Sequence, residues 1–261
     1  MKKILILTIK RILPDNIIKK ILIVLIERLL PGFLIEWIYN IIVKPIKYIR
    51  YPFLIFKNKD ISNVFTKIHQ TNFWSSNESV SGLGSEKIAT RHTRKEILNI
   101  IKKYKIANLL DIPCGDCNWI EPENLGIDYI GADIVKEVIK SNKGKFDGKI
   151  DFRVLDLTVD NLPKADLILC RECLQHLSMD NIKKSLKNIK KSGAHYLLVT
   201  SHKDGKNINI NNGNFFTIDL EKAPFLFGTP IEEIEEIDSN IRAIRNHKQY
   251  LYLYDINKLD I

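Results

Sequence analysis

The stretch from Asn108 to Trp119, which reads NLLDIPCGDCNW, constrains the fold of this chain more than any other. It begins with a short apolar run that ends in an acid, Asp111, and then turns sharply over 113–116. A strand followed at once by a glycine turn is where an open α/β sheet binds a nucleotide-like ligand, because glycine lets the backbone approach the ligand closely. The acids beside the turn favour a cationic or hydroxyl-rich ligand over a bare pyrophosphate.

After this turn, strand-like and helix-like segments alternate. The predicted strands are 108–113, 128–133, 150–156, 166–170 and 195–200, and the predicted helices between them are 134–142 and 180–191. Apolar strands separated by short helices are typical of a parallel sheet with helices on both faces. Segments 231–237 and 250–254 predict a final strand pair, and Ser85 is predicted to cap a helix over 86–104.

Three acids, Asp111, Asp133 and Asp156, end three consecutive predicted strands. In a parallel sheet with right-handed crossovers, these strand ends meet along one edge. The spacing from Gly115 to Asp133 is near the roughly 20 residues at which an acid accepts hydrogen bonds from ribose hydroxyls. Asp156 can accept from an exocyclic amine, and Asp111 can offset a positive charge. S-adenosylmethionine (SAM) matches all three; alternatively, each acid only caps the turn after its strand.

The runs DIPCGDCNW, YIGADI, LDL (155–157) and LCRECLQHLS (169–178) resemble the class I SAM-dependent methyltransferases. More narrowly, they are similar to a bacterial subgroup whose first motif reads D-x-P-C-G-D-x-x-W. The upstream run NFWSSNESVSGLGS also resembles that subgroup, and the likeness covers roughly residues 65–255. It implies a Rossmann-like α/β sheet of seven strands, the last antiparallel, with SAM as cofactor.

The resemblance also implies roles for the matching positions. Those facing the methionine part of SAM would be Asp111, Cys114 and Gly115, together with Asp116 of the same turn. Asp133 would hold the ribose, and the adenine would be framed by Asp156 and Leu157. The residues near the pocket or closing over the cofactor would be Trp119, Trp74, Gly84 and Ser85. Cys114 and Cys117 occupy the outer glycine positions of the commoner GxGxG pattern, and Cys117 also departs from the subgroup.

The fourth predicted strand ends in the run RECLQH, residues 171–176. In the fold that the resemblance implies, this end faces the transferred methyl group. His176 is the preferred general base because histidine titrates near neutral pH, with His202 as the second candidate and a purely structural His176 as the alternative. Arg171 would orient an acidic or hydroxylated acceptor, or pair with Asp156 or Glu172. The Asn-rich segment 207–213 is predicted to form a loop on the acceptor side.

Residues 1–59 hold the excess positive charge of the chain. They carry 12 Lys and Arg against three acids, which gives the formal net charge of +9, while the remaining 28 basic and 28 acidic residues cancel. A neutral globular part argues against a nucleic-acid partner. Prolines interrupt this segment, and it lacks the roughly 20 consecutive apolar residues of a spanning helix. Residues 1–57 are therefore predicted to form short helices on an anionic membrane surface; packing on the domain or on a partner, and a true span, are the alternatives.

The four cysteines form two CxxC pairs, Cys114/Cys117 and Cys170/Cys173. Such pairs raise the alternative of a zinc site. However, the pairs lie far apart in the sequence and Cys114 already has a place in the turn, so no metal is expected. No small-residue cleavage site follows the N-terminal apolar run, which predicts a reducing cytoplasmic compartment and free thiols.

The sequence thus predicts three segments. These are a membrane-associating extension over 1–57, a linker over 58–84 that could cover the pocket, and a methyltransferase domain over 85–261. We expect a SAM-dependent methyltransferase at the inner face of the cell membrane, acting on a hydroxyl of a small-molecule or glycan acceptor such as a surface-polysaccharide sugar. The alternatives are a non-catalytic SAM- or nucleotide-binding module that recruits partners and, less favoured, a dehydrogenase. The sequence does not predict the oligomeric state.

Overall fold

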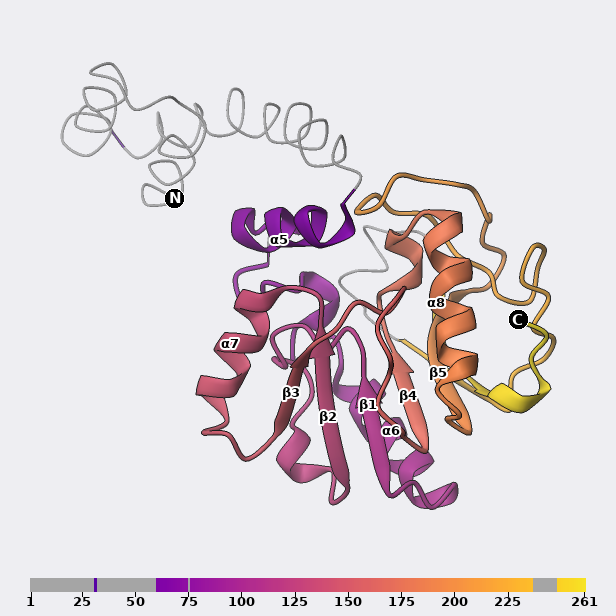
Figure 1. The fold of residues 1–261 in the computed structure, drawn as a ribbon, viewed down its shortest axis with the longest axis horizontal. Coiled ribbons are helices and arrows are strands. Elements are labelled where there is room, and N and C mark those ends of the chain that lie inside the picture. The colour runs from indigo at the N-terminus through magenta and orange to yellow at the C-terminus, as the bar shows by residue number, and fades with distance from the viewer. Residues whose placement is uncertain (1–30, 32–59, 75, 237–247) are drawn as a thin grey trace. The chain divides into compact units, whose positions relative to one another are not determined.

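The computed structural model describes Pro31 and residues 60–74, 76–236 and 248–261 (Figure 1). All of these except Pro31 belong to one structural unit, Asn58–Ile261. The extension predicted over 1–57 lies, apart from Pro31, outside the described residues, so its association with a membrane stays a prediction. Within the described part of the chain, no helix combines the length and the apolar character needed to cross a membrane.

One seven-stranded sheet organises the unit, in the order β3-β2-β1-β4-β5-β7-β6. The first five strands run parallel, and β7 is antiparallel to both of its neighbours. This confirms the predicted Rossmann-like sheet with its antiparallel last strand. The strands are β1 Asn108–Asp111, β2 Asp128–Asp133, β3 Asp151–Val154, β4 Leu167–Cys170, β5 Tyr196–His202, β6 Glu232–Glu235 and β7 Gln249–Asp255.

Helices accompany the sheet on both faces, and short 3-10 turns lie between the longer elements. The α-helices of the described residues are α5 Ile61–Thr71, α6 Arg91–Lys103, α7 Lys136–Lys145 and α8 Met179–Lys191, and the 3-10 turns are η2 Leu83–Ser85, η3 Pro122–Asn124, η4 Leu174–His176 and η5 Ile256–Lys258. Helix α8 shows why such segments are helical. The Ser178 side chain caps its N-terminus, Lys190 and Lys191 lie in its last turn, and its buried residues recur at helical spacing.

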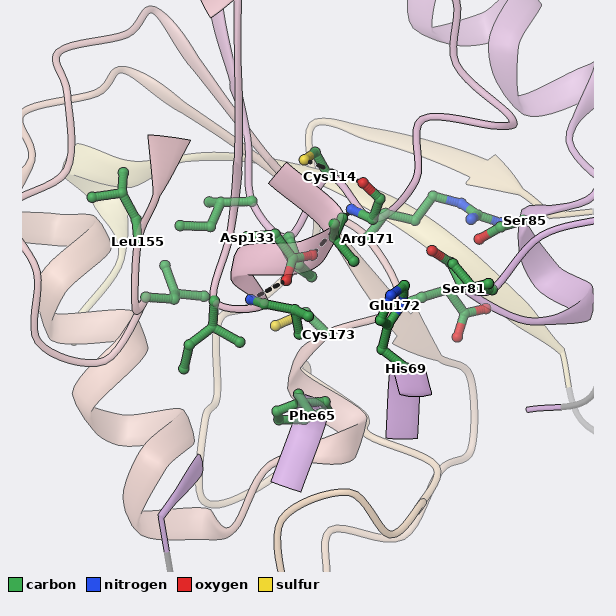
Figure 2. Close-up of a pocket in the computed structure, with 18 of the residues that line it drawn as sticks. Phe65, His69, Ser81, Ser85, Cys114, Asp133, Leu155, Arg171, Glu172 and Cys173 are labelled. Atoms are coloured by element: carbon green, nitrogen blue, oxygen red, sulfur yellow. Dashed lines mark hydrogen bonds between the residues drawn. The ribbon is translucent and has the colours of Figure 1, made fainter. Parts of the chain in front are cut away.

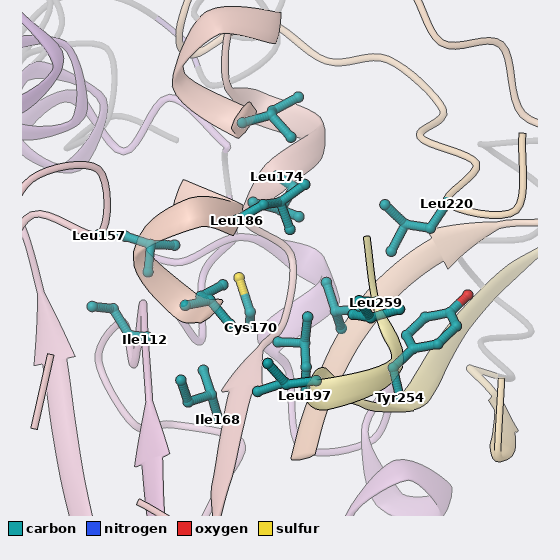
Figure 3. Packing of buried hydrophobic residues seen from close by; sticks show 14 of the residues in the cluster. Ile112, Leu157, Ile168, Cys170, Leu174, Leu186, Leu197, Leu220, Tyr254 and Leu259 are labelled. Carbon is teal, nitrogen blue, oxygen red and sulfur yellow. The ribbon is translucent and has the colours of Figure 1, made fainter. Parts of the chain in front are cut away.

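The core has two layers because successive side chains of a strand point to opposite faces of the sheet. On one face, Leu110 and Leu197 belong to a cluster with Leu186 of α8, which Figure 3 shows from close by. On the other face, Leu109 clusters with Ile97 of α6 and with Ile139 of α7. The central strands are therefore apolar on both sides, as strands covered by helices on both faces must be.

The helix predicted over 86–104 starts later than expected. It begins only at Arg91, and Ser85 lies in the η2 turn instead of capping a helix. The Glu86 backbone is extended, and its side chain accepts a hydrogen bond from Ser76 Oγ at 2.8 Å. Glu86 is therefore held by the preceding segment, and the helix forms only after it.

The predicted linker over 58–84 contains a helix, α5. The Asp60 carboxylate caps its N-terminus by accepting the Ser62 and Asn63 backbone N–H groups, and Asn72 ends it in a left-handed conformation. Val64 and Ile68 are its fully buried residues, and they recur at the four-residue spacing of one helix face. This part of the chain is folded onto the unit and does not act as a mere connection.

Two glycines offer a matched test of this packing. A Cβ atom on Gly131 of β2 would lie 2.5 Å from Cε1 of the buried Phe152 ring, whereas a Cβ on the exposed Gly144 of α7 would meet nothing. We expect Gly131→Ala to lower the free energy of unfolding by about 1–3 kcal/mol through overpacking. Gly144→Ala should raise it by about 0.5–1 kcal/mol because alanine favours a helix. Urea denaturation of both variants measures the difference, and equal stabilities would contradict the packing described.

Candidate active site

A cavity opens where strands β1 to β4 end, and α5 contributes to its wall (Figure 2). Its lining comes from segments that are far apart in the sequence. The lining residues are Ile61, Phe65 and His69 of α5; Trp74, Val80, Ser81 and Ser85; 112–115 and Trp119 after β1; 133–135 and Val138 after β2; 155–158 after β3; and 171–173 with Leu177 after β4. The edge predicted to bind a ligand is therefore the edge that holds the cavity.

The glycine turn after β1 is held in a tight, left-handed geometry. Gly115 has φ +55°, and a Cβ atom there would lie 2.3 Å from Ser81 Oγ, so both the backbone and the space favour glycine. The Cys114 backbone N–H donates to the Ala132 carbonyl at 2.8 Å, and the Asn142 amide donates to the Gly115 carbonyl at 2.8 Å. The turn is thus fixed by β2 and α7 on one side and by Ser81 on the other.

Asp133, predicted to hold a ribose, lies on the cavity wall at the end of β2 (Figure 2). Its carboxylate accepts backbone N–H groups from Gly115 at 3.1 Å and from Val135 at 2.9 Å. Burial raises the pKa of Asp133 to about 6, although these N–H donors lower it. The two donors fix the orientation of the carboxylate toward the turn, and each oxygen retains further acceptor capacity.

Asp156 and Leu157, predicted to frame an adenine, also line the cavity. Asp156 Oδ1 accepts the Thr158 backbone N–H at 2.8 Å and the Thr158 hydroxyl at 2.7 Å, so it caps the turn after β3. Capping a turn and binding a ligand are the two alternatives that the sequence leaves open for such an acid. At Asp156 the cap itself lies on the cavity wall, so one position can do both.

Asp111 is the one of the three strand-end acids that does not line the cavity. It is 1% exposed and accepts the Tyr129 hydroxyl at 2.7 Å, while its Oδ1 atom has no hydrogen-bond partner among the described residues. Burial raises the pKa of Asp111 to about 7 despite the Tyr129 hydrogen bond. Because Asp111 does not line the cavity, its role at the methionine part of SAM stays a prediction.

Asp116 also lies outside the cavity lining and has clear structural partners. Its carboxylate accepts the Ser79 hydroxyl at 2.9 Å and the Val80 backbone N–H at 3.0 Å, and its own N–H donates to Ser81 Oγ at 3.2 Å. These contacts tie residues 76–86, which we call the strap, to the glycine turn. The second acid of the motif therefore holds the strap that forms part of the cavity wall.

Arg171 reaches the cavity, but its main partner is one that the sequence did not predict. Its Nε donates to Glu236 Oε1 at 2.7 Å, both side chains are 6% exposed, and its NH2 group donates to the Gly84 carbonyl at 2.8 Å. The guanidinium also lies over the Trp119 ring, 4.6 Å from its centroid. Burial lowers the pKa of Arg171, but Glu236 and Glu172 raise it more, so the net shift is upward.

This ion pair corrects the expected partners of Arg171, because the hydrogen-bonded partner is Glu236 instead of Asp156 or Glu172. The arginine joins the end of β4 to the strap and to the segment after β6. Gly84, which was predicted to lie near the cofactor, does not line the cavity. Its carbonyl accepts the hydrogen bond from Arg171 instead. The other three residues predicted to lie near or over a cofactor do line the cavity, although their contact with it stays a prediction; they are Trp74, Ser85 and Trp119.

His176 is buried against Trp74, with the two ring centroids 5.3 Å apart, and it is not a lining residue. Its Nδ1 atom lies 2.8 Å from the Asn214 carbonyl oxygen. Because a carbonyl can only accept, Nδ1 carries the proton and Nε2 is the basic nitrogen. The second candidate, His202, is fully buried beside Phe215. The catalytic role of His176 stays a prediction.

The Asn-rich segment 207–213 is built largely into the protein itself. Asn209 and Asn212 accept backbone N–H groups where α8 begins. Asn207 donates to two backbone carbonyls of the turn over 219–223. These three asparagines satisfy backbone groups of their own chain, and a place of the segment on the acceptor side stays a prediction.

Sequence reasoning missed two contributors to the cavity. One is the stripe Ile61, Phe65 and His69 of α5, which recurs every fourth residue as one face of a helix requires. The four-residue spacing is visible in the sequence and could have predicted the helix. The polar residues between these positions made the segment resemble a linker instead. The other is Glu172, whose side-chain partners come from distant parts of the sequence.

All four cysteines are free thiols. Across residues 60–74, 76–236 and 248–261, no group of three or more His, Cys, Asp and Glu side chains could hold a metal ion. Burial raises the pKa of the Cys114 thiol well above its ordinary value, with Cys117 adding to the shift. Cys114 and Cys173 line the cavity, and Cys114 does so as a neutral, compact side chain.

Comparisons with known proteins bear on the family. Residues 110–194 match the family model of a methyltransferase domain. No curated protein matches the sequence. The solved structure of 1,6-didemethyltoxoflavin-N1-methyltransferase from Burkholderia thailandensis is similar at 15% identity, with 72% of this chain and 87% of that chain covered and a TM-score of 0.53. A SAM-dependent methyltransferase from Clostridium acetobutylicum is 14% identical over 63% of this chain and 91% of that chain, with a TM-score of 0.47.

At 15% identity the Burkholderia structure bears on the fold alone. The family match covers the glycine turn, the acids after β2 and β3, and the end of β4, which are segments that build the cavity. The match therefore supports a SAM-dependent methyltransferase activity at this edge of the sheet.

Proposed function

We propose that this enzyme methylates a hydroxyl group of a membrane-proximal acceptor, such as a sugar of a surface polysaccharide, at the inner face of a bacterial cell membrane. The proposed location at the membrane rests on one observation. The segment 1–57 is basic and apolar, whereas the rest of the sequence has no net charge. A second support is the motif D-x-P-C-G-D-x-x-W at 111–119, which resembles a bacterial subgroup of the family. The acceptor, the compartment and the subgroup are all parts of this proposal.

The chemistry of the residues in and beneath the cavity wall supports SAM as the ligand. Gly115 brings bare backbone to the cavity, Asp133 can accept from ribose hydroxyls, and the Asp156 segment can frame an adenine. Asp111 lies beneath the turn with its Oδ1 unpartnered among the described residues, and a cationic methionine end would favour its charged form. SAM supplies an activated methyl group on a good leaving group, so the protein has to align the acceptor and receive its proton.

Asp133 is expected to decide cofactor affinity. Asp133→Ala should weaken SAM binding at least tenfold, because buried hydrogen bonds to the ribose are lost, each worth about 1.5–3 kcal/mol for a charged acceptor. In the wild-type protein, affinity should fall as the pH drops below about 6, where this carboxyl takes up a proton. Isothermal titration measures both effects. An unchanged dissociation constant in the variant would remove Asp133 from the site.

A matched pair of histidine variants tests the general base. His176→Ala should leave SAM binding intact and lower turnover by roughly 10²–10⁴, as expected when a general base is lost. His69→Ala is the comparison, because His69 lines the cavity from α5 whereas His176 is buried against Trp74. Production of S-adenosylhomocysteine is the readout. If His69→Ala loses activity and His176→Ala keeps it, the base is His69.

The membrane proposal is tested by removing residues 1–57. The full chain should sediment with vesicles that contain anionic lipid and should be released by added salt, because the attraction of basic residues is screened. The fragment 58–261 should stay in the supernatant and keep its affinity for SAM. Aggregation of the fragment would indicate instead that the extension covers the domain, and binding to neutral vesicles in high salt would argue against an electrostatic contact.

A further inference from the structure

A second, smaller cavity lies outside the candidate active site. It opens between helix α6 and the segment 119–125, which contains η3, and it holds about 420 Å³ of space, its open side included. We call it the α6 cavity. Trp119 belongs to its wall and also to the wall of the larger cavity at the sheet edge. Neither the cofactor nor the methyl acceptor proposed above uses the α6 cavity, so the chemistry of its wall has to indicate what it holds.

Most of this wall is apolar. Two of the apolar side chains come from α6 and the others from the segment after β1; they are Ile97, Leu98, Trp119, Ile120 and Leu125. Ile97, Trp119 and Ile120 are at most 5% exposed, so the surrounding packing fixes them. Leu98 and Leu125 are only half-buried, and a ligand that covered them would remove apolar surface from water. This part of the wall favours an aliphatic or aromatic group.

Arg94 supplies a positive charge whose position is fixed. Its NH1 group donates to the Lys87 carbonyl at 3.1 Å, to Thr90 Oγ1 at 2.7 Å and to the Trp119 carbonyl at 3.1 Å. Its Nε and NH2 groups donate to no residue in the described part of the chain. A guanidinium that is held by one nitrogen keeps the planar edge between the other two for a carboxylate, which it binds through two parallel hydrogen bonds.

Glu121 supplies a negative charge on the same wall. It is exposed, and its Oε2 atom accepts the Asn124 side-chain amide at 2.7 Å, so a neutral donor orients it. Among the described residues, no ion pair joins Glu121 to Arg94. Glu78, an acid whose charge also interacts with Arg94, accepts its hydrogen bonds from other residues. Two opposite charges therefore stand beside an apolar surface without a direct contact between them.

We propose that the α6 cavity binds an apolar α-amino acid, such as leucine, as the free zwitterion. The carboxylate of the ligand pairs with the Nε–NH2 edge of Arg94, and its ammonium pairs with Glu121. Its side chain covers Leu98 and Leu125. A free amino acid is a small ligand that carries both charges next to an apolar group, and both of its ion pairs are charge-assisted hydrogen bonds. This site is independent of the methyl acceptor.

Ligands that each lack one group of leucine test the assignment. 4-Methylpentanoate lacks the ammonium, 3-methylbutylamine lacks the carboxylate, and glycine lacks the apolar side chain. Isothermal titration of the full chain gives the affinity of each. Leucine should bind about tenfold or more tightly than any of the three, because each of them loses a charge-assisted hydrogen bond or the apolar contact. Equal binding of leucine and 4-methylpentanoate, or no binding of leucine at all, would overturn the proposal.

A matched pair of variants assigns the ammonium. Glu121→Gln keeps the size of the side chain and removes its charge. The preference for leucine over 4-methylpentanoate should then fall to less than about twofold, while the affinity for 4-methylpentanoate should not fall. Glu123→Gln makes the same change on an exposed residue outside the cavity lining, so it should leave every affinity as in the wild type. If Glu121→Gln keeps the full preference for leucine, Glu121 does not bind the ammonium and the proposal is wrong.

Arg94→Lys tests the carboxylate, because lysine keeps the charge but lacks the planar edge. The preference for leucine over 3-methylbutylamine should fall to less than about threefold. Should this variant fail to fold, Glu121→Gln still decides, because Glu121 is exposed and its side chain only accepts from Asn124. Leucine should also bind when S-adenosylhomocysteine saturates the larger cavity. If S-adenosylhomocysteine abolishes leucine binding instead, leucine occupies the larger cavity and the assignment to the α6 cavity is wrong.

Discussion

The buried ion pair between Arg171 and Glu236 is the interaction on which the cavity depends. It joins the end of β4 to the segment after β6, and through the Gly84 carbonyl it also holds the strap. Removing either partner would leave an uncompensated charge inside the protein, which costs far more stability than the pair contributes. The Trp119 ring completes the enclosure by covering the guanidinium. Arg171 therefore has a structural role, because it connects β4, the strap and the segment after β6. These contacts also place it in the cavity wall.

Carboxylates in this protein hold the segments that surround the cavity. Asp116 holds the strap, Asp133 orients the glycine turn, and Asp156 caps the turn after β3. Each uses backbone or hydroxyl donors, which hold the carboxylate without neutralising it. The raised pKa values of Asp111 and Asp133 have the same origin. Burial removes the water that would stabilise their charge, and a cationic or hydroxyl-rich ligand can take the place of that water.

The sequence was sufficient where local pattern and topology decide the outcome. Apolar runs located the seven strands, and acids at the strand ends located Asp133 and Asp156 on the cavity wall. It was insufficient where a residue depends on a distant partner. Arg171 and Glu236 are 65 positions apart, and nothing local marks them as a pair. Helix α5 was missed because its cap and its cavity stripe resemble a polar linker. Three asparagines of 207–213 hold backbone groups of their own chain, a role that the sequence did not predict because backbone capping and ligand binding use the same amide.

The place of Glu236 and Gln249 in the chain has a consequence for how the enzyme is made. Glu236 follows Arg171 by 65 positions, so at roughly 5–20 residues per second a ribosome adds it roughly 3–13 s later. During that interval the strands already made can begin to pair, but Arg171 still lacks Glu236, and Glu172 still lacks Gln249. A nascent chain therefore holds the glycine turn before it holds a finished cavity. The ion pair of Arg171 is complete only when the segment after β6 has joined the unit.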